Sequence, residues 1–381
     1  MDPAEGERLA AAAAATSGPF RLGVVCMTKR PLCFATWLEY HLCLGVERFY
    51  VRVEDTPALA SLLEQSRWQN AVRASFHTGT ARDWAKQSSR QHEHVVQAIH
   101  WARADGLTHL LHIDDDELLC CLYGFEAMRA SIECAPADVV NLHLRNLEAL
   151  VPSAECANPF AEARAFRHRP HEYGAYGRPP SSGKSIGDLR RPMLQPNGPH
   201  FFGLRGESHK GELGDAPSYV LPAAAAVILH YESVSYQRWR DKFTEFARYD
   251  GGGKAQQFSS FNRASILACT QMLQARAARE SAAAHSLLDH FSSDDAEESA
   301  RQVWTQWRCE PPGLPHPPAQ GALVLRDHGI TLMQPPAASM GASEEAANEL
   351  LSLYVRPPQS LLWRVMQVGM ASRVESGVCA P

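Results

Sequence analysis

Hydrophobic positions in the first third of the chain alternate between short apolar runs and longer segments with helical spacing. Uninterrupted apolar runs are typical of strands that are buried on both faces of a parallel sheet. Such runs alternating with helices predict an α/β fold, with a mostly parallel sheet covered by helices on both faces. The apolar runs occupy residues 22–27, 46–53, 72–77 and 110–113, and the helical segments occupy residues 34–44, 57–65 and 84–103.

The pattern becomes less regular after Gly124. Residues 151–215 are rich in Pro, Gly, His and Arg, a composition that favours long loops around a ligand. We expect residues 1–18 to be a disordered leader and residues 19–275 to form one catalytic domain. We expect residues 276–381 to form a helical or partly disordered C-terminal region that contributes no residue to catalysis.

Composition narrows the choice of partners and compartment. A net charge of −5 with 21% charged residues gives no reason to expect a nucleic acid partner. The sequence lacks an apolar stretch long enough for a membrane span, and its acidic start is unlike a signal peptide. The ten cysteines contain no Cys-x-x-Cys pair, which favours a reducing compartment such as the cytoplasm. A location in the Golgi or ER lumen is the alternative, if a membrane anchor lies elsewhere.

Four consecutive acidic residues, Asp114 to Glu117, interrupt an otherwise apolar run. Burying even one unpaired carboxylate costs several kcal/mol, so we expect the strand to end at Ile113 and the acids to lie beyond it. In open α/β sheets ligands bind at this carboxyl edge. Two carboxylates there can hold Mn²⁺ or Mg²⁺, which in turn binds a diphosphate. The alternative is a solvated acidic turn without a ligand.

Several segments, taken in order, resemble GT-A glycosyltransferases of the family 92 and family 2-like group. Residues 34–53 contain Trp37-x-x-x-His41-x-x-x-Gly45-Val46, and residues 112–119 are similar to the Asp-Val-Asp-Glu-Phe metal motif of that group. Later landmarks in the same order are Lys184-Ser185-Ile186, Gly198-Pro199-His200, His230-Tyr231-Glu232 and Phe261-Asn262-Arg263-Ala264-Ser265. The resemblance covers residues 20–270 and implies a GT-A, Rossmann-like fold.

The resemblance implies a metal-dependent enzyme that moves a hexose from a nucleotide sugar, most simply a UDP-sugar, to a hydroxyl acceptor with inversion. The acceptor would be a carbohydrate or another hydroxyl compound. The ends of the first and second strands depart from the family's pattern. The alternative function is therefore a catalytically impaired module that binds carbohydrate or a protein partner.

The same resemblance assigns metal ligands. Asp116 is expected to bind the cation directly, and so to take part in catalysis, while Asp114 contacts the ribose or reaches the metal through water. A third ligand is expected from His200 or His230, which follow a turn and end a strand respectively. Mn²⁺ and Mg²⁺ both accept such oxygen and imidazole ligands.

The remaining site residues concern the donor and the acceptor. The acceptor hydroxyl needs a carboxylate base within hydrogen-bond reach, and Glu172, Glu207 and Asp215 lie in the appropriate region. Of these we prefer Glu207. Donor contacts are expected from Thr28, Lys29, Asp55, Arg90 and Lys184, at the strand ends, on the helix before the acidic strand, and in the loop region.

Overall fold

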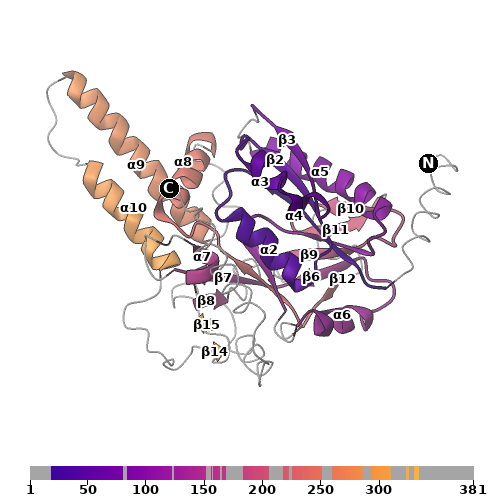
Figure 1. Cartoon of the computed structure of the whole chain (residues 1–381). Helices are drawn as coiled ribbons and strands as arrows, with labels where there is room; N and C mark the ends of the chain where they lie inside the picture. Colours follow the sequence, from indigo (N-terminus) through magenta and orange to yellow (C-terminus); the bar gives the residue numbers. More distant parts are fainter. Residues whose placement is uncertain are drawn as a thin grey trace. The chain divides into compact units, whose positions relative to one another are not determined.

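The computed structural model describes residues 19–79, 84–121, 124–151, 156, 158–163, 165–168, 183–205, 218–222, 225–250, 260–285, 293–309, 323–325 and 330–333. The predicted leader, residues 1–18, lies outside these residues. The chain divides into two compact units (Figure 1). Among the described residues, 19–147 and 183–230 belong to the first unit, and 148–168 and 231–333 to the second. No helix within the described residues is long and apolar enough to cross a membrane.

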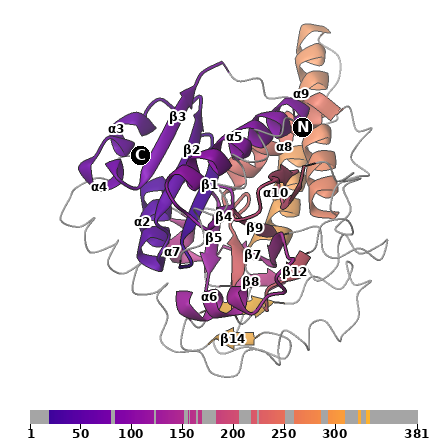
Figure 2. The ribbon, with the colours of Figure 1, turned by 90° about the vertical axis from the view of Figure 1, so that its right-hand side faces the viewer.

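A seven-stranded sheet with the order β12-β6-β9-β4-β1-β2-β3 forms the first unit, and Figure 2 shows β1, β2 and β3 side by side. Only β9 runs antiparallel to its neighbours, β4 and β6; the other pairings are parallel. The predicted mixed α/β fold with a mostly parallel sheet is therefore confirmed. The strands are β1 (Leu22–Thr28), β2 (Arg48–Glu54), β3 (Val72–His77), β4 (His109–His112), β6 (Asn141–Leu144), β9 (Lys184–Asp188) and β12 (Ser218–Val220).

Helices α2 (Phe34–Leu44), α5 (Trp84–Ala104) and α6 (Phe125–Glu133) belong to the same unit. α5 contacts β1, β2 and β4, and its buried Ala98, Ile99 and Ala102 join Val25 and Leu110 in the core. The predictions of helices over residues 34–44 and 84–103 are confirmed.

The helix predicted over residues 57–65 is present in a shorter form, α3 (Leu59–Leu63), and a further short helix that was not predicted, α4 (Ser66–Gln69), follows it. The chain leaves helical conformation at Gln65, whose ψ is 139°. After this break Trp68, in α4, is 2% exposed.

The acidic segment lies between two strands. β4 ends at His112, and β5 (Glu117–Cys120) begins directly after the acidic turn. β5 pairs antiparallel with β13 (Val227–His230), which places His230 opposite Glu117. As expected, the strand ends before the acids, at His112 instead of Ile113; the second strand, which begins at Glu117, was not predicted.

Long loops were predicted over residues 151–215, and for residues 183–205 this prediction is wrong. That segment holds β9 and a hairpin of β10 (Leu194–Asn197) and β11 (Phe201–Leu204). The sequence of β9, Lys-Ser-Ile-Gly-Asp, does not alternate in a strand-like way, yet all five residues are buried between β4 and β6. Polar residues are tolerated there because hydrogen bonds and ion pairs satisfy them.

The second unit contains three helices that pack side by side, α8 (Tyr236–Asp250), α9 (Ser260–His285) and α10 (Ser293–Arg308) (Figure 1). Trp239 and Trp304 are fully buried, and Trp239 Nε1 donates to Ser265 Oγ at 2.9 Å. Of the predicted C-terminal region, residues 276–285 and 293–308 are helical as expected, whereas residues 323–325 and 330–333 form strands that were not expected, and α9 continues across residue 275. Its other elements are β7 (Asn146–Leu150, which starts in the first unit), α7 (Pro159–Glu162), β8 (Ala165–His168), β14 (Leu323–Leu325) and β15 (Ile330–Met333).

Candidate metal and donor site

The acidic turn between β4 and β5 is closed by hydrogen bonds of its own. Glu117 N–H donates to the Asp114 carbonyl at 3.2 Å, and Asp114 N–H donates to Glu117 Oε2 at 2.8 Å. Burial raises the pKa of the Glu117 carboxyl to about 7, against the opposing effect of Lys184. Glu117 thus builds the turn, and the other three acids are more accessible.

Lys184, the first residue of β9, is the buried counter-ion of this turn. Its Nζ lies 2.6 Å from Asp114 Oδ2 and 3.3 Å from Glu117 Oε2, and the side chain is 1% exposed. Burial opposes the charge of Lys184, but the two carboxylates raise its pKa above the usual range. Burial alone would raise the pKa of Asp114, but Lys184 lowers it below the usual range. Asp114 is therefore held ionised.

Asp115 and Asp116 face different partners. Thr28, at the end of β1, donates its hydroxyl to Asp115 Oδ2 at 2.5 Å. Asp116 Oδ1 lies 3.8 Å from Nε2 of His230, and the Asp116 side chain is 25% exposed. A carboxylate oxygen and an imidazole nitrogen thus face each other at the edge of the turn, and both are suitable ligands for a divalent cation.

His200 is held by the backbone around β9. Its Nδ1 donates to the Gly183 carbonyl at 2.8 Å, and its own carbonyl accepts from Ser185 Oγ at 2.7 Å. Burial lowers the pKa of the imidazole to about 4, so the ring is neutral at pH 7.

The predicted metal ligands do not converge completely. Among the described residues, no three ligand atoms drawn from Asp114, Asp116, His200 and His230 lie within 4.8 Å of one another. Among them, Asp116 and His230 face each other, with Oδ1 and Nε2 3.8 Å apart. The residues present therefore fit a cation on Asp116 and His230, with Asp114 occupied by Lys184.

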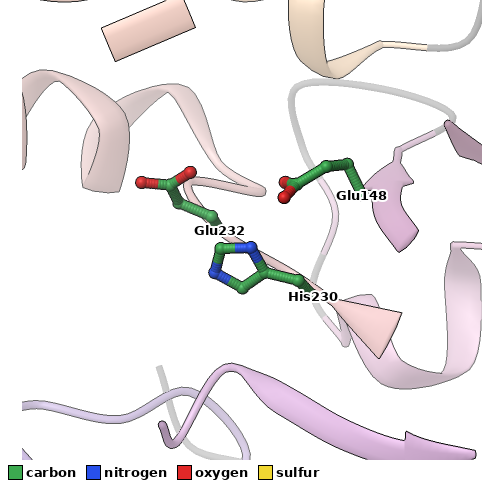
Figure 3. Close-up of side chains that lie close together, drawn as sticks. All are labelled: Glu148, His230 and Glu232. Carbon is green, nitrogen blue, oxygen red and sulfur yellow. The ribbon is translucent and has the colours of Figure 1, made fainter. Parts of the chain in front are cut away.

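Glu148, His230 and Glu232 do meet this spacing (Figure 3). Two carboxylates and an imidazole are compatible with a divalent cation. Within the second unit, however, Arg308 already donates to both carboxylates, at 2.6 Å to Glu148 and 2.7 Å to Glu232. Lys242 Nζ lies 2.5 Å from the other oxygen of Glu232. Arg308 and Lys242 therefore already compensate the charge of these carboxylates.

The role of Arg308 is not evident from the sequence. Its side chain is 1% exposed at the end of α10, and 160 positions separate it from Glu148. Nothing in the local sequence around Arg308 distinguishes it from Arg301, which is exposed on the same helix. Glu232 could have been noticed as an acid directly after an apolar strand.

The ends of β1 and β2 are joined by an ion pair between two residues predicted to bind the donor. Lys29 Nζ lies 2.8 Å from Asp55 Oδ2, and about a quarter of each side chain is exposed. Both Arg30 and Asp55 have left-handed backbone, with φ of 52° and 45°. Such conformations are uncommon outside glycine and occur often at functional sites.

Arg90, also predicted to bind the donor, is already engaged. Its Nε and Nη2 donate to the two carboxylate oxygens of Glu54, at 2.7 and 3.0 Å. Glu54 is buried at the end of β2, and Arg90 shares the neutralisation of its charge with Arg52, whose Nε lies 2.9 Å from Glu54 Oε1. The neighbouring Gln91 donates to Asp114 Oδ1 at 3.4 Å. The structure thus brings α5 to the acidic turn through Gln91.

Glu207, the preferred acceptor base, lies outside the described residues, as do Glu172 and Asp215.

Comparison with known proteins supports the general assignment. No family model matches the chain. The chain is similar to a glycosyltransferase-like protein of Arabidopsis thaliana, with 28% identity over 202 residues, 43% of this chain and 45% of the relative. The chain therefore spans less than half the length of this relative. Together with the fold, the similarity supports a glycosyltransferase family for this chain.

Proposed function

We propose that the chain is a metal-dependent glycosyltransferase that moves a hexose from a UDP-sugar to a hydroxyl acceptor, with inversion. The observation that carries the proposal is the acidic turn at the carboxyl end of β4. This turn lies beside the end of β1, since Thr28 contacts Asp115, and ligands bind at this edge of open α/β sheets.

The charge of the turn favours a divalent cation. The turn carries four carboxylates, Asp114 to Glu117, and the ammonium group of Lys184 pairs with two of them, Asp114 and Glu117. Even when Glu117 holds a proton, the turn keeps excess negative charge, which a bound cation would compensate. When bound, Mn²⁺ or Mg²⁺ would neutralise the diphosphate leaving group.

Asp116 and His230 are the residues best placed to hold that cation. Their facing atoms are 3.8 Å apart, a separation that two ligands of one ion can have when each lies about 2.0–2.2 Å from it. His200 is kept as the alternative imidazole ligand. Asp114 is proposed to orient the ribose or a metal-bound water, because Lys184 already occupies one of its oxygens.

Donor contacts are proposed for the ends of β1 and β2. Lys29 and Asp55 are partly exposed and offer a cation and a carboxylate to the base, ribose or phosphate of a nucleotide. Thr28 and Arg90 are proposed to support the donor site indirectly, because Thr28 donates a hydrogen bond to Asp115 and Arg90 donates one to Glu54. Lys184 is buried, so we assign it to keeping Asp114 ionised rather than to direct diphosphate binding.

Glu207 is proposed as the base that deprotonates the acceptor hydroxyl. An inverting transfer needs a carboxylate at this step. The proton passes from the hydroxyl to the carboxylate as the new glycosidic bond forms and the bond to the diphosphate breaks.

The proposal is tested with a thermal-shift panel of nucleotide sugars in the presence of Mn²⁺ or EDTA. A ligand that binds the folded protein raises its Tm, so we expect a rise with a UDP-sugar and Mn²⁺ together. An equal rise in EDTA would contradict a metal-dependent site. The same protein is then mixed with the UDP-sugar, Mn²⁺ and a panel of hydroxyl acceptors. A metal-dependent rise in Tm without release of UDP to any of these acceptors would favour the alternative, a catalytically impaired sugar-binding module.

A further inference from the structure

His230 is part of a short chain of polar contacts within the first unit. Its Nε2 faces Asp116 Oδ1 at 3.8 Å, and its Nδ1 lies 3.3 Å from the amide nitrogen of Asn146. Asn146 is 9% exposed and is the first residue of β7. This is the arrangement of a metal-binding histidine, in which one ring nitrogen faces the metal site and a protein group is hydrogen-bonded to the other ring nitrogen.

Backbone hydrogen bonds fix the spacing of the polar contacts among Asp116, His230 and Asn146. Ile228 N–H donates to the carbonyl of Arg145 at 2.8 Å, so the residue before Asn146 is hydrogen-bonded to the residue two positions before His230. His230 is also paired with Glu117 in the β13–β5 ladder. Asn146 therefore approaches Nδ1 from a rigid strand and not from a loop.

From these contacts, and on the basis of the proposed function, we propose that Asn146 is a positioning residue that sets the tautomer of His230 for cation binding. With the Asn146 amide in this orientation its nitrogen can only donate to Nδ1, and this orientation goes with a neutral ring whose proton is on Nε2. That nitrogen then faces the Asp116 carboxylate as a donor and has no lone pair for a metal.

Cation binding by Nε2 requires the opposite tautomer. The proton must then sit on Nδ1 and needs an acceptor, because metal-bound imidazoles nearly always donate their other N–H to a protein group. A half-turn of the Asn146 amide brings its carbonyl oxygen to Nδ1 and supplies that acceptor. An amide can serve both states, whereas a carboxylate or an ammonium group could serve only one.

Mn²⁺ titration of the full chain, with UDP present, tests the proposal through binding rather than activity. Asn146→Leu is nearly equal in volume but removes both donor and acceptor. We expect its Mn²⁺ affinity to fall by about 10–100-fold, as for other partners of metal-binding histidines. In a His230→Ala background the same substitution should change the affinity by less than about twofold.

A second variant gives a readout that a purely structural role would not move. Asn146→Asp can only accept, so in metal-free protein at a pH where the ring is neutral it should place the His230 proton on Nδ1. Histidine ¹⁵N chemical shifts report this tautomer directly. The wild type should carry the proton on Nε2 without metal and on Nδ1 with Mg²⁺ and UDP, where Mg²⁺ avoids paramagnetic broadening.

The outcomes separate this inference from the proposed function. Unchanged Mn²⁺ affinity in Asn146→Leu, an equal loss in the His230→Ala background, or one tautomer in all states would overturn the role of Asn146 alone. Failure of the wild type to bind Mn²⁺ with UDP would overturn the proposed function, and this inference with it. If Asn146→Leu does not fold, the tautomer measured in Asn146→Asp decides.

Discussion

Lys184 Nζ lies 2.6 Å from Asp114 Oδ2, although 70 positions separate the two residues in sequence. The contact exists because β9 runs antiparallel beside β4 and begins where the acidic turn begins, with Ser185 opposite His112. A buried ammonium group thereby compensates two carboxylates that the chain could not otherwise hold at this edge of the sheet. The candidate metal site therefore depends on a strand from the middle of the sequence.

Lys184→Met should destabilise the protein by about 3–5 kcal/mol, because breaking a buried ion pair leaves uncompensated charge. The lower end is expected, since Asp114 is one-third exposed. Urea denaturation at pH 7 measures the effect. Adding Glu117→Gln to Lys184→Met should recover part of the loss; a double variant as unstable as the single one would contradict the assigned pairing.

Because His41 is buried as a neutral imidazole, we expect the protein to lose stability in acid. Its Nδ1 donates to the Trp37 carbonyl at 2.8 Å and its Nε2 accepts from Leu119 N–H at 3.2 Å, so the neutral ring fits and a second proton does not. Burial lowers the pKa of the imidazole to about 3, whereas an unfolded histidine titrates near 6.5. Between these values the unfolded state binds more protons, so the free energy of unfolding rises with pH.

For His41 alone the expected loss between pH 7 and pH 5 is about 2 kcal/mol. Urea denaturation at the two pH values gives the difference for wild type and for His41→Gln, in which it should be smaller by about that amount. His100→Gln, an exposed position on α5, is the matched control and should keep the wild-type difference. An unchanged difference in His41→Gln would show that the imidazole is not held neutral.

The hydrophobic periodicity predicted most of the first unit correctly, because a short apolar run such as residues 22–27 is typical of a strand that is covered on both faces. It failed at β9, whose burial depends on partners that are distant in sequence. The residues around Lys184 predict an exposed lysine in a loop. Lys184 becomes a buried counter-ion because β9 pairs with β4. Within the candidate site, Asp116 and His230 do face each other, whereas Arg90 proved to be paired with Glu54.

Arg308→Met should destabilise the second unit by about 3–5 kcal/mol, because it leaves Glu148 and Glu232 buried without their shared cation. Urea denaturation of the full chain measures the loss. Arg301→Met, exposed on the same helix, should cost less than about 1 kcal/mol. Equal effects of the two variants would contradict a special role for Arg308. A truncation after residue 275 also removes this cation, so we expect it to destabilise the unit similarly.

Glu207→Gln should separate binding from transfer. If Glu207 is the acceptor base, the amide cannot take the hydroxyl proton, and kcat should fall by about 10²–10⁴-fold. Mn²⁺-dependent UDP binding should remain unchanged, because the base acts on the acceptor. Steady-state UDP release with an active donor and acceptor pair measures kcat, and Glu172→Gln and Asp215→Asn provide the comparison. Full activity in Glu207→Gln would assign the base elsewhere.

Calorimetric titration of UDP into wild type, Asp116→Asn and Asp138→Asn, each with Mn²⁺ or EDTA, tests the central claim most directly. Asp138 is exposed and lies outside the acidic turn, so its variant controls for a lost surface charge. We predict that wild type and Asp138→Asn bind UDP only with Mn²⁺, and that Asp116→Asn loses this binding while its Tm changes little. UDP binding by Asp116→Asn with wild-type affinity and metal dependence would contradict the claim that the acidic turn holds the cation.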